Sequence, residues 1–183
     1  MIRSERLLLR PWQPEDFPRY AALNSDPRVR RYFPKILTRE ESDAELRTFQ
    51  QRFALEGFGM IAAELAETKQ FIGILGLQTM PYAIAGLPQP AVEIGWRLAP
   101  EFWGMGLATE GAQAVIDYAF NQLHLRSVVA VTTVTNQPSR RVMERLGMRH
   151  RPDLDFEHPK VPDGHALRPH VLYQLNRAEI LGD

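Results

Sequence analysis

A short turn with two glycines constrains the fold of this chain more than any other feature. The run Val92–Leu98 has the apolar pattern of a strand, and Leu107–Asn121 has the apolar spacing of an amphipathic helix. Gly104 and Gly106 lie between the two, where the backbone can bend without a side chain clashing. The sequence therefore predicts a strand, a tight turn and a helix in direct succession.

The start of that helix is expected to bind a phosphate. The first helical N–H groups have no intrahelical acceptor, and together with the helix dipole they favour an anion. A P-loop needs Lys followed by Ser or Thr, and that pair is missing here. A dinucleotide fingerprint needs Gly or Ala where Thr109 stands and an acid at the end of the next strand, where the sequence reads Thr132–Asn136. The pyrophosphate of coenzyme A is the third ligand class that uses such a turn.

The sequence around the turn resembles the acyl-CoA loop of the GNAT (general N-acetyltransferase) superfamily. The segment 106–108 matches the Gly-x-Gly/Ala end of that loop, although Trp103 stands where the loop usually begins with Gln or Arg. The string Glu93–Trp96, followed by Phe102–Glu110, is similar to the branch that contains the ribosomal-protein alanine N-acetyltransferases. By this resemblance, the residues expected to bind acetyl-CoA here are Trp96, Arg97, Leu98, Trp103, Gly104, Met105, Gly106, Leu107, Ala108 and Thr109.

A second segment, Asn136–Met148, resembles the helix that flanks the coenzyme in the same superfamily. Asn136 suits the N-cap of this helix, and Gly147 suits the left-handed position after its end. The resemblance implies that Asn136 and Ser139 line the cofactor cleft. Arg140 or Arg141 is the candidate for the adenosine 3′-phosphate, since Arg matches phosphate geometry, while a solvated basic helix face is the alternative.

The chain contains no cysteine, which excludes an acyl-cysteine intermediate. Direct attack of an amine on the acetyl thioester is the natural alternative, and the resemblance implies it too. The attacking amine must first lose a proton, and Glu93, among apolar neighbours, is the candidate base. The alternative is a Glu that pairs with Arg97 or faces solvent.

The group that protonates the leaving thiolate is expected in the helix after Asn136. Many members of the superfamily have a Tyr seven residues after the Asn, where this chain has Met143. In the branch that the sequence resembles, the Ser three residues after the Asn is the usual candidate, which is Ser139 here. The alternative is a serine that only caps the helix.

The order of predicted elements indicates one domain over residues 1–183, of the α/β (α+β) class, with a mixed sheet and helices on both faces. The resemblance implies the GNAT fold, in which a mostly antiparallel sheet is splayed in the middle. Strands are expected at 5–10, 60–65, 71–77, 92–98, 125–134 and 170–175, and helices at 14–23, 26–33, 38–55, 107–121 and 136–147.

The charge balance argues against nucleic-acid or membrane partners, since 22 Lys and Arg residues offset 22 Asp and Glu residues. We expect a cytoplasmic protein, a monomer or homodimer, with no metal, because the histidines between 150 and 170 fit no standard zinc site. The expected function is acyl-CoA-dependent N-acyl transfer, with acetyl-CoA as donor and a protein N-terminal α-amine or a small amine as acceptor. A non-catalytic acyl-CoA-binding protein and a nucleotide-binding module are the alternatives.

Overall fold

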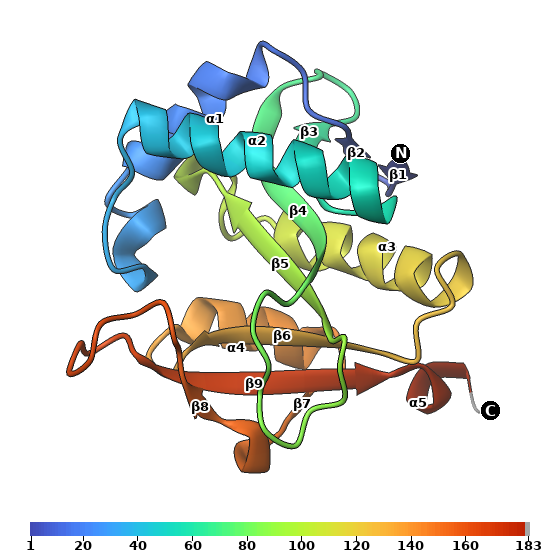
Figure 1. Cartoon of the computed structure of the whole chain (residues 1–183). Coiled ribbons are helices and arrows are strands. Elements are labelled where there is room, and N and C mark those ends of the chain that lie inside the picture. The colour runs from blue at the N-terminus through green and yellow to red at the C-terminus, as the bar shows by residue number, and fades with distance from the viewer. Residues whose placement is uncertain (182–183) are drawn as a thin grey trace.

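A nine-stranded sheet forms the centre of the computed structural model, which describes residues 1–181 (Figure 1). Its strand order is β1-β2-β3-β4-β5-β6-β9-β7, and β8 also pairs with β9. All these pairs are antiparallel except β5 with β6, which is parallel. The strands are β1 Ile2–Arg3, β2 Leu7–Arg10, β3 Met60–Leu65, β4 Phe71–Thr79, β5 Val92–Leu98, β6 Ser127–Thr133, β7 Arg149–His150, β8 Phe156–Glu157 and β9 Pro169–Asn176.

Helices cover both faces of this sheet, with α1 and α2 on one face and α3 and α4 on the other (Figure 1). None of the helices within residues 1–181 combines the length and the apolar character that a membrane crossing needs. The α-helices are α1 Asp16–Ser25, α2 Arg39–Glu56, α3 Leu107–Asn121, α4 Gln137–Arg145 and α5 Arg177–Leu181, and the 3-10 helices are η1 Val29–Tyr32, η2 Pro100–Phe102 and η3 Pro152–Leu154.

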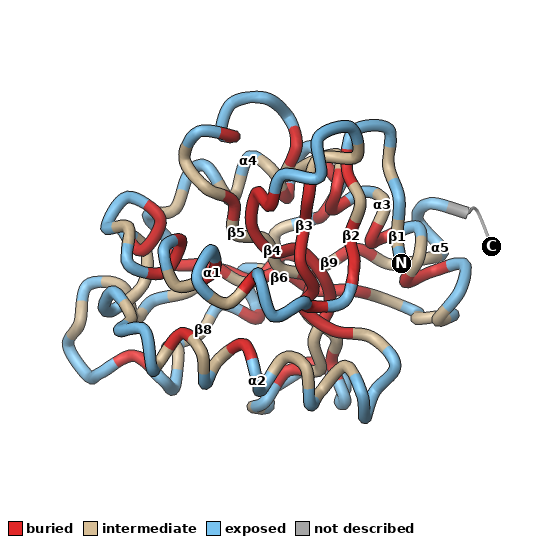
Figure 2. The backbone as a smooth tube through the Cα atoms, turned by 90° about the horizontal axis from the view of Figure 1, so that it is seen from above, coloured by how far each residue is buried: buried red, intermediate tan, exposed pale blue. Residues whose placement is uncertain are grey.

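Alternate residues of the central strands enter different hydrophobic cores. In β3, Met60 and Ala62 pack with Tyr20 and Leu46 of α1 and α2, whereas the residues between them pack on the side of α3. This period of two is what a strand buried on both faces requires. The buried segments accordingly converge on the middle strands in Figure 2.

The sheet is splayed between β5 and β6. The two strands share one registered pair, Glu93 with Val129, and β5 then runs away from β6 (Figure 1). Because the strands are parallel, the glycine turn after β5 and the start of α4 after β6 lie at the same end of the sheet. The mixed, mostly antiparallel and splayed sheet expected from the sequence is therefore confirmed.

Local signals placed most helix ends correctly. The Thr38 side chain accepts a hydrogen bond from the Glu41 amide, the Glu41 side chain accepts one from the Thr38 amide, and α2 ends at Gly57 with φ 77°. The expected helix at 26–33 is instead the single 3-10 turn η1. Strands β1, β7 and β8 and helix α5 were not predicted, since each has five residues or fewer and carries little periodicity.

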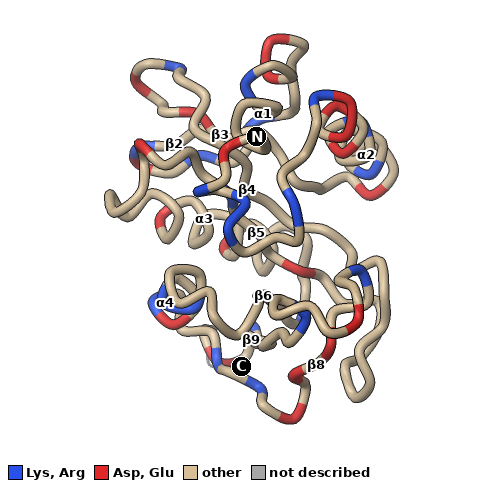
Figure 3. Tube along the Cα trace, turned by 90° about the vertical axis from the view of Figure 1, so that its left-hand side faces the viewer, with Lys and Arg blue, Asp and Glu red and all other residues tan. Residues whose placement is uncertain are grey.

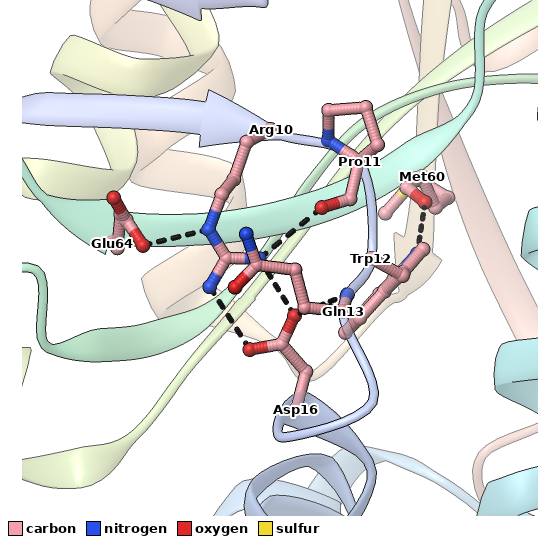
Figure 4. A network of polar contacts seen from close by, with 7 residues as sticks. All are labelled: Arg10, Pro11, Trp12, Gln13, Asp16, Met60 and Glu64. Carbon is pink, nitrogen blue, oxygen red and sulfur yellow. Dashed lines mark hydrogen bonds and ion pairs between the residues drawn. The ribbon is translucent and has the colours of Figure 1, made fainter.

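A buried ionic network joins β2, β3 and the start of α1 (Figure 4). Arg10 donates from Nη1 and Nη2 to the Asp16 carboxylate at 2.6 and 3.0 Å, and from Nε to Glu64 at 2.7 Å. The three side chains are 8%, 0% and 7% exposed. Nearby, the Trp12 indole donates to the Met60 carbonyl at 2.9 Å. These contacts fix the first helix against the sheet.

Candidate active site

The glycine turn after β5 is open to solvent and conformationally demanding. Gly104 and Gly106 have φ angles of 74° and 78°, in the left-handed region that favours glycine. Residues 103–106 are exposed, whereas Leu107 is buried and anchors the first turn of α3. The Trp103 indole donates to the Leu98 carbonyl at 2.7 Å, which ties the turn back to the end of β5.

The backbone amides of residues 104–109 have no acceptor within residues 1–181. The first helical bond of α3 runs from the Glu110 amide to the Gly106 carbonyl at 3.0 Å. Within residues 1–181, the amides of 104–109 donate to no other group. An anion at this position would therefore meet several free N–H donors and the positive end of a 15-residue helix.

Arg6, near the N-terminus, contacts the glycine turn and the first turn of α3, and the sequence alone does not predict this contact. Arg6 donates from Nε to Glu110 at 2.6 Å and from Nη1 to the Met105 carbonyl at 3.0 Å, and the Ser4 hydroxyl donates to Glu110 at 2.7 Å. Although burial favours the neutral acid, the hydrogen bonds that Glu110 accepts from the Arg6 amide, the Ser4 hydroxyl and the Arg6 side chain hold its pKa below the usual value. The acidic side chain in the first turn of α3 is thus already paired, and the free amides remain available to an anion.

Glu93 lies on β5 where β5 and β6 meet. Its carboxylate accepts a hydrogen bond from Gln78 Nε2 of β4 at 2.9 Å. Burial raises the pKa of Glu93 to about 7, against the opposing effects of the Gln78 hydrogen bond and the Lys160 charge. A carboxylate with this pKa can accept a proton at neutral pH. The alternative of a Glu93–Arg97 ion pair is not observed.

The Arg97 guanidinium faces the first two helices instead. Its Nη1 donates to the Tyr20 hydroxyl at 3.0 Å, to Asn24 Oδ1 at 2.6 Å and to Glu45 at 3.2 Å. Arg97 Nη1 is therefore held by α1 and α2, which leaves the backbone of Arg97 as its expected contact with the coenzyme.

Helix α4 begins beside the same end of the sheet. Asn136 caps it by accepting from the Ser139 amide at 3.3 Å and donates to Thr132 Oγ1 at 2.9 Å. Arg140 donates to the Tyr173 hydroxyl and to the Val134 carbonyl, both at 3.2 Å, whereas Arg141 is exposed. Of the two candidates for the 3′-phosphate, Arg141 is therefore the one whose guanidinium has no partner within residues 1–181. Figure 3 shows that α4 carries mainly basic residues, which are Arg140, Arg141 and Arg145, with Glu144 as its acidic residue.

Four rings from distant segments gather on the Glu93 face of the sheet. The His158 ring lies 5.1 Å from Tyr82, 6.0 Å from Phe156 and 4.6 Å from His170. Burial, together with the charges of His170 and Lys160, lowers the pKa of His158 to about 4. Burial raises the pKa of Tyr82, and the Glu93 charge adds to this effect. In residues 1–181, no group of three His, Asp or Glu side chains could hold a metal ion.

Comparisons with known proteins match the whole architecture. A family model described as an acetyltransferase (GNAT) domain matches residues 6–149. The uncharacterised N-acetyltransferase YnaD of Bacillus subtilis is 32% identical over 97% of this chain and 98% of its own length. The crystal structure of a GNAT-family acetyltransferase from Bacillus anthracis has a TM-score of 0.79 and 25% identity, covering 96% of this chain and 98% of that one.

Two further solved structures share the fold at 18% identity and a TM-score of 0.74. One is the spermidine N-acetyltransferase of Vibrio cholerae in complex with CoA and spermine, covering 96% of this chain and 98% of that chain. The other is the ribosomal-protein-S5-alanine acetyltransferase of Vibrio fischeri, covering 96% and 95%. The first binds a small polyamine and the second is named for a protein acceptor, so the shared fold by itself does not define the acceptor.

Proposed function

This chain belongs to the GNAT acetyltransferase family and is an N-acetyltransferase, and from that premise we propose that it transfers acetyl directly from acetyl-CoA to a primary amine. The observation that carries the proposal is the row of free amides at 104–109, at the start of α3 and at the open end of the splayed sheet. These amides bind the pyrophosphate of the coenzyme, and Arg141 binds its 3′-phosphate. We further propose that the protein is cytoplasmic, by its similarity to bacterial acetyltransferases.

In the proposed reaction, Glu93 accepts the proton that the acceptor amine must lose. The amine nitrogen then bonds to the acetyl carbonyl carbon, and the bond from that carbon to sulfur breaks. Ser139 donates its hydroxyl proton to the leaving thiolate and regains one from solvent, and the nitrogen of the new amide releases its extra proton to solvent. The acceptor enters on the Glu93 face of the sheet, where Tyr82, His158 and His170 form a wall.

Acetyl-CoA at 100 times its Kd is expected to stabilise the protein by about 2.7 kcal/mol, whereas NAD and ATP should have little effect. Gly106→Val should weaken acetyl-CoA binding at least about tenfold, because a β-branched residue is strained at this φ and displaces the amides. Gly57→Val introduces the same strain at φ 77° at the far end of α2 and serves as the matched control. Thermal shift and calorimetry measure both effects. Equal stabilisation by NAD or ATP would point to a nucleotide-binding module instead.

Ser139→Ala is expected to lower kcat about tenfold or more, with acetyl-CoA affinity retained, since the lost group acts on the thiolate and not on the bound donor. The measurement is thiol release with a panel of peptides and small amines. Ser25→Ala, which removes an exposed hydroxyl at the end of α1, is the control. If Ser139→Ala keeps full turnover, Ser139 is not the proton donor to the thiolate and only caps the helix.

A further inference from the structure

Two arginines from distant segments lie against one phenylalanine ring beside the site. The guanidinium carbon of Arg30, in η1, is 4.1 Å from the Phe33 ring centroid, and that of Arg97, in β5, is 4.7 Å from it. Arg30 is 7% exposed, and the Arg97 side chain is 12% exposed. Two cationic groups are thus buried side by side.

The surrounding protein balances only part of this charge. Glu45 accepts a hydrogen bond from Arg97 Nη1 at 3.2 Å, and the Tyr20 hydroxyl also donates to that carboxylate. Arg30 donates from Nε to a neutral group, the Lys35 carbonyl, at 2.9 Å. Burial, together with the Arg97 charge, lowers the pKa of Arg30 to about 10, and Tyr20 and Glu45 raise the pKa of Arg97 against the effect of burial, so both arginines are still protonated at neutral pH.

Two donor nitrogens of this pair lack any partner. Arg30 Nη1 and Arg97 Nε are buried and form no hydrogen bond to any group in residues 1–181. Buried donors of charged groups are almost always satisfied, because an unmet donor loses its solvation without compensation. Two unmet donors on two neighbouring cations, with a surplus of positive charge, indicate a site for an anion.

The position of the pair relates this anion to the acceptor. Arg97 and Glu93 are four residues apart on β5, so their side chains share one face and their Cα atoms are about 13 Å apart. An acceptor with its amine at Glu93 could therefore place a second group near the arginines. The segment 33–37, which joins η1 to α2, contacts Arg30 through the Lys35 carbonyl.

We propose that Arg30 and Arg97 bind a carboxylate of the acceptor, so that the substrate is an amine with a carboxylate several bonds away, such as an ω-amino acid or a short peptide. The proposal rests on the proposed function, since it assigns the acceptor of that same site. Arg is suited to this role because its planar fork binds carboxylates through two hydrogen bonds. A polyamine, which carries only positive groups, would be repelled.

The test compares each acid with its amide: 4-aminobutyrate with 4-aminobutanamide, and glycylglycine with glycylglycinamide, with spermidine as the polyamine. The wild-type protein is expected to use each acid with a kcat/KM at least about tenfold above that of its amide, mainly through KM. Arg30→Met should abolish this preference, and Arg30→Lys should restore part of it. Arg31→Met, a change at the exposed neighbour in η1, is the matched control and should keep the preference.

Equal use of acids and amides by the wild-type protein, or an undiminished preference in Arg30→Met, would overturn the proposal. If acetyl-CoA binds but none of these amines is acetylated, the proposed function fails at the acceptor step. The anion site at Arg30 and Arg97 then needs a test that does not depend on turnover. Calorimetry with 4-acetamidobutyrate then decides, since binding that depends on Arg30 supports the anion site and its absence rejects it. A thermal unfolding curve for each variant checks that it is folded.

Discussion

Glu93→Gln should lower kcat by about 10²- to 10³-fold at pH 7, because general bases contribute rate factors of this order and an amide cannot take the proton of the acceptor amine. Gln keeps the size of the side chain and can still bond to Gln78, so the fold should be retained. The measurement is thiol release at saturating acetyl-CoA. An unchanged kcat would remove Glu93 from the mechanism.

The pH dependence gives an independent check on the same residue. Glu93 acts only as the carboxylate, and burial raises its pKa to about 7, so wild-type kcat should rise as pH increases through 7 and level off above it. In Glu93→Gln this rise should be absent. The Gln78 hydrogen bond lowers the pKa of Glu93, so Gln78→Leu should move the midpoint to higher pH. A midpoint that stays in place in Gln78→Leu would contradict the assignment.

Arg10→Met should lower the free energy of unfolding by about 3–5 kcal/mol, which is the range for breaking a buried ion pair from one side. The substitution leaves the carboxylates of Asp16 and Glu64 buried without their cation (Figure 4). Urea denaturation of the wild-type and variant proteins measures the difference.

The control for Arg10 is a pair of similar chemistry on the surface. Arg28 is 68% exposed and pairs with Asp26 at 2.6 Å, so Arg28→Met should change the free energy of unfolding by less than about 1 kcal/mol. Similar losses in the two variants would mean that burial does not set the strength of these pairs.

Elements defined by local chemistry could be predicted from the sequence. The bounds of β5 and α3 were predicted correctly, because apolar periodicity and the glycines between them mark both ends. The α4 cap at Asn136 and the left-handed Gly147 were also predicted correctly, since each depends on residues a few positions away. The splayed sheet was anticipated from the resemblance of two motifs and not from the pattern of any single strand.

Contacts between distant segments could not be predicted in this way. Arg6 and Glu110 are 104 residues apart, and Arg97 and Asn24 are 73 apart, so no spacing rule connects them. For the same reason, no local pattern indicates that Tyr82, His158 and His170 share one face. The roles of Glu93, Ser139 and the cofactor contacts remain predictions that the proposed variants test.

The divergence of β5 from β6 also bears on solubility. Beyond the pair Glu93 and Val129, β5 and β6 each have an edge with unpaired backbone N–H and C=O groups. Unpaired strand edges are where β-proteins aggregate. Here the two edges face each other across the splay, so each edge shields the other from a neighbouring chain. The pantetheine arm of the donor carries two amide groups, which can form hydrogen bonds with the unpaired backbone groups of these edges. The protein with acetyl-CoA bound should therefore aggregate less than the protein without it.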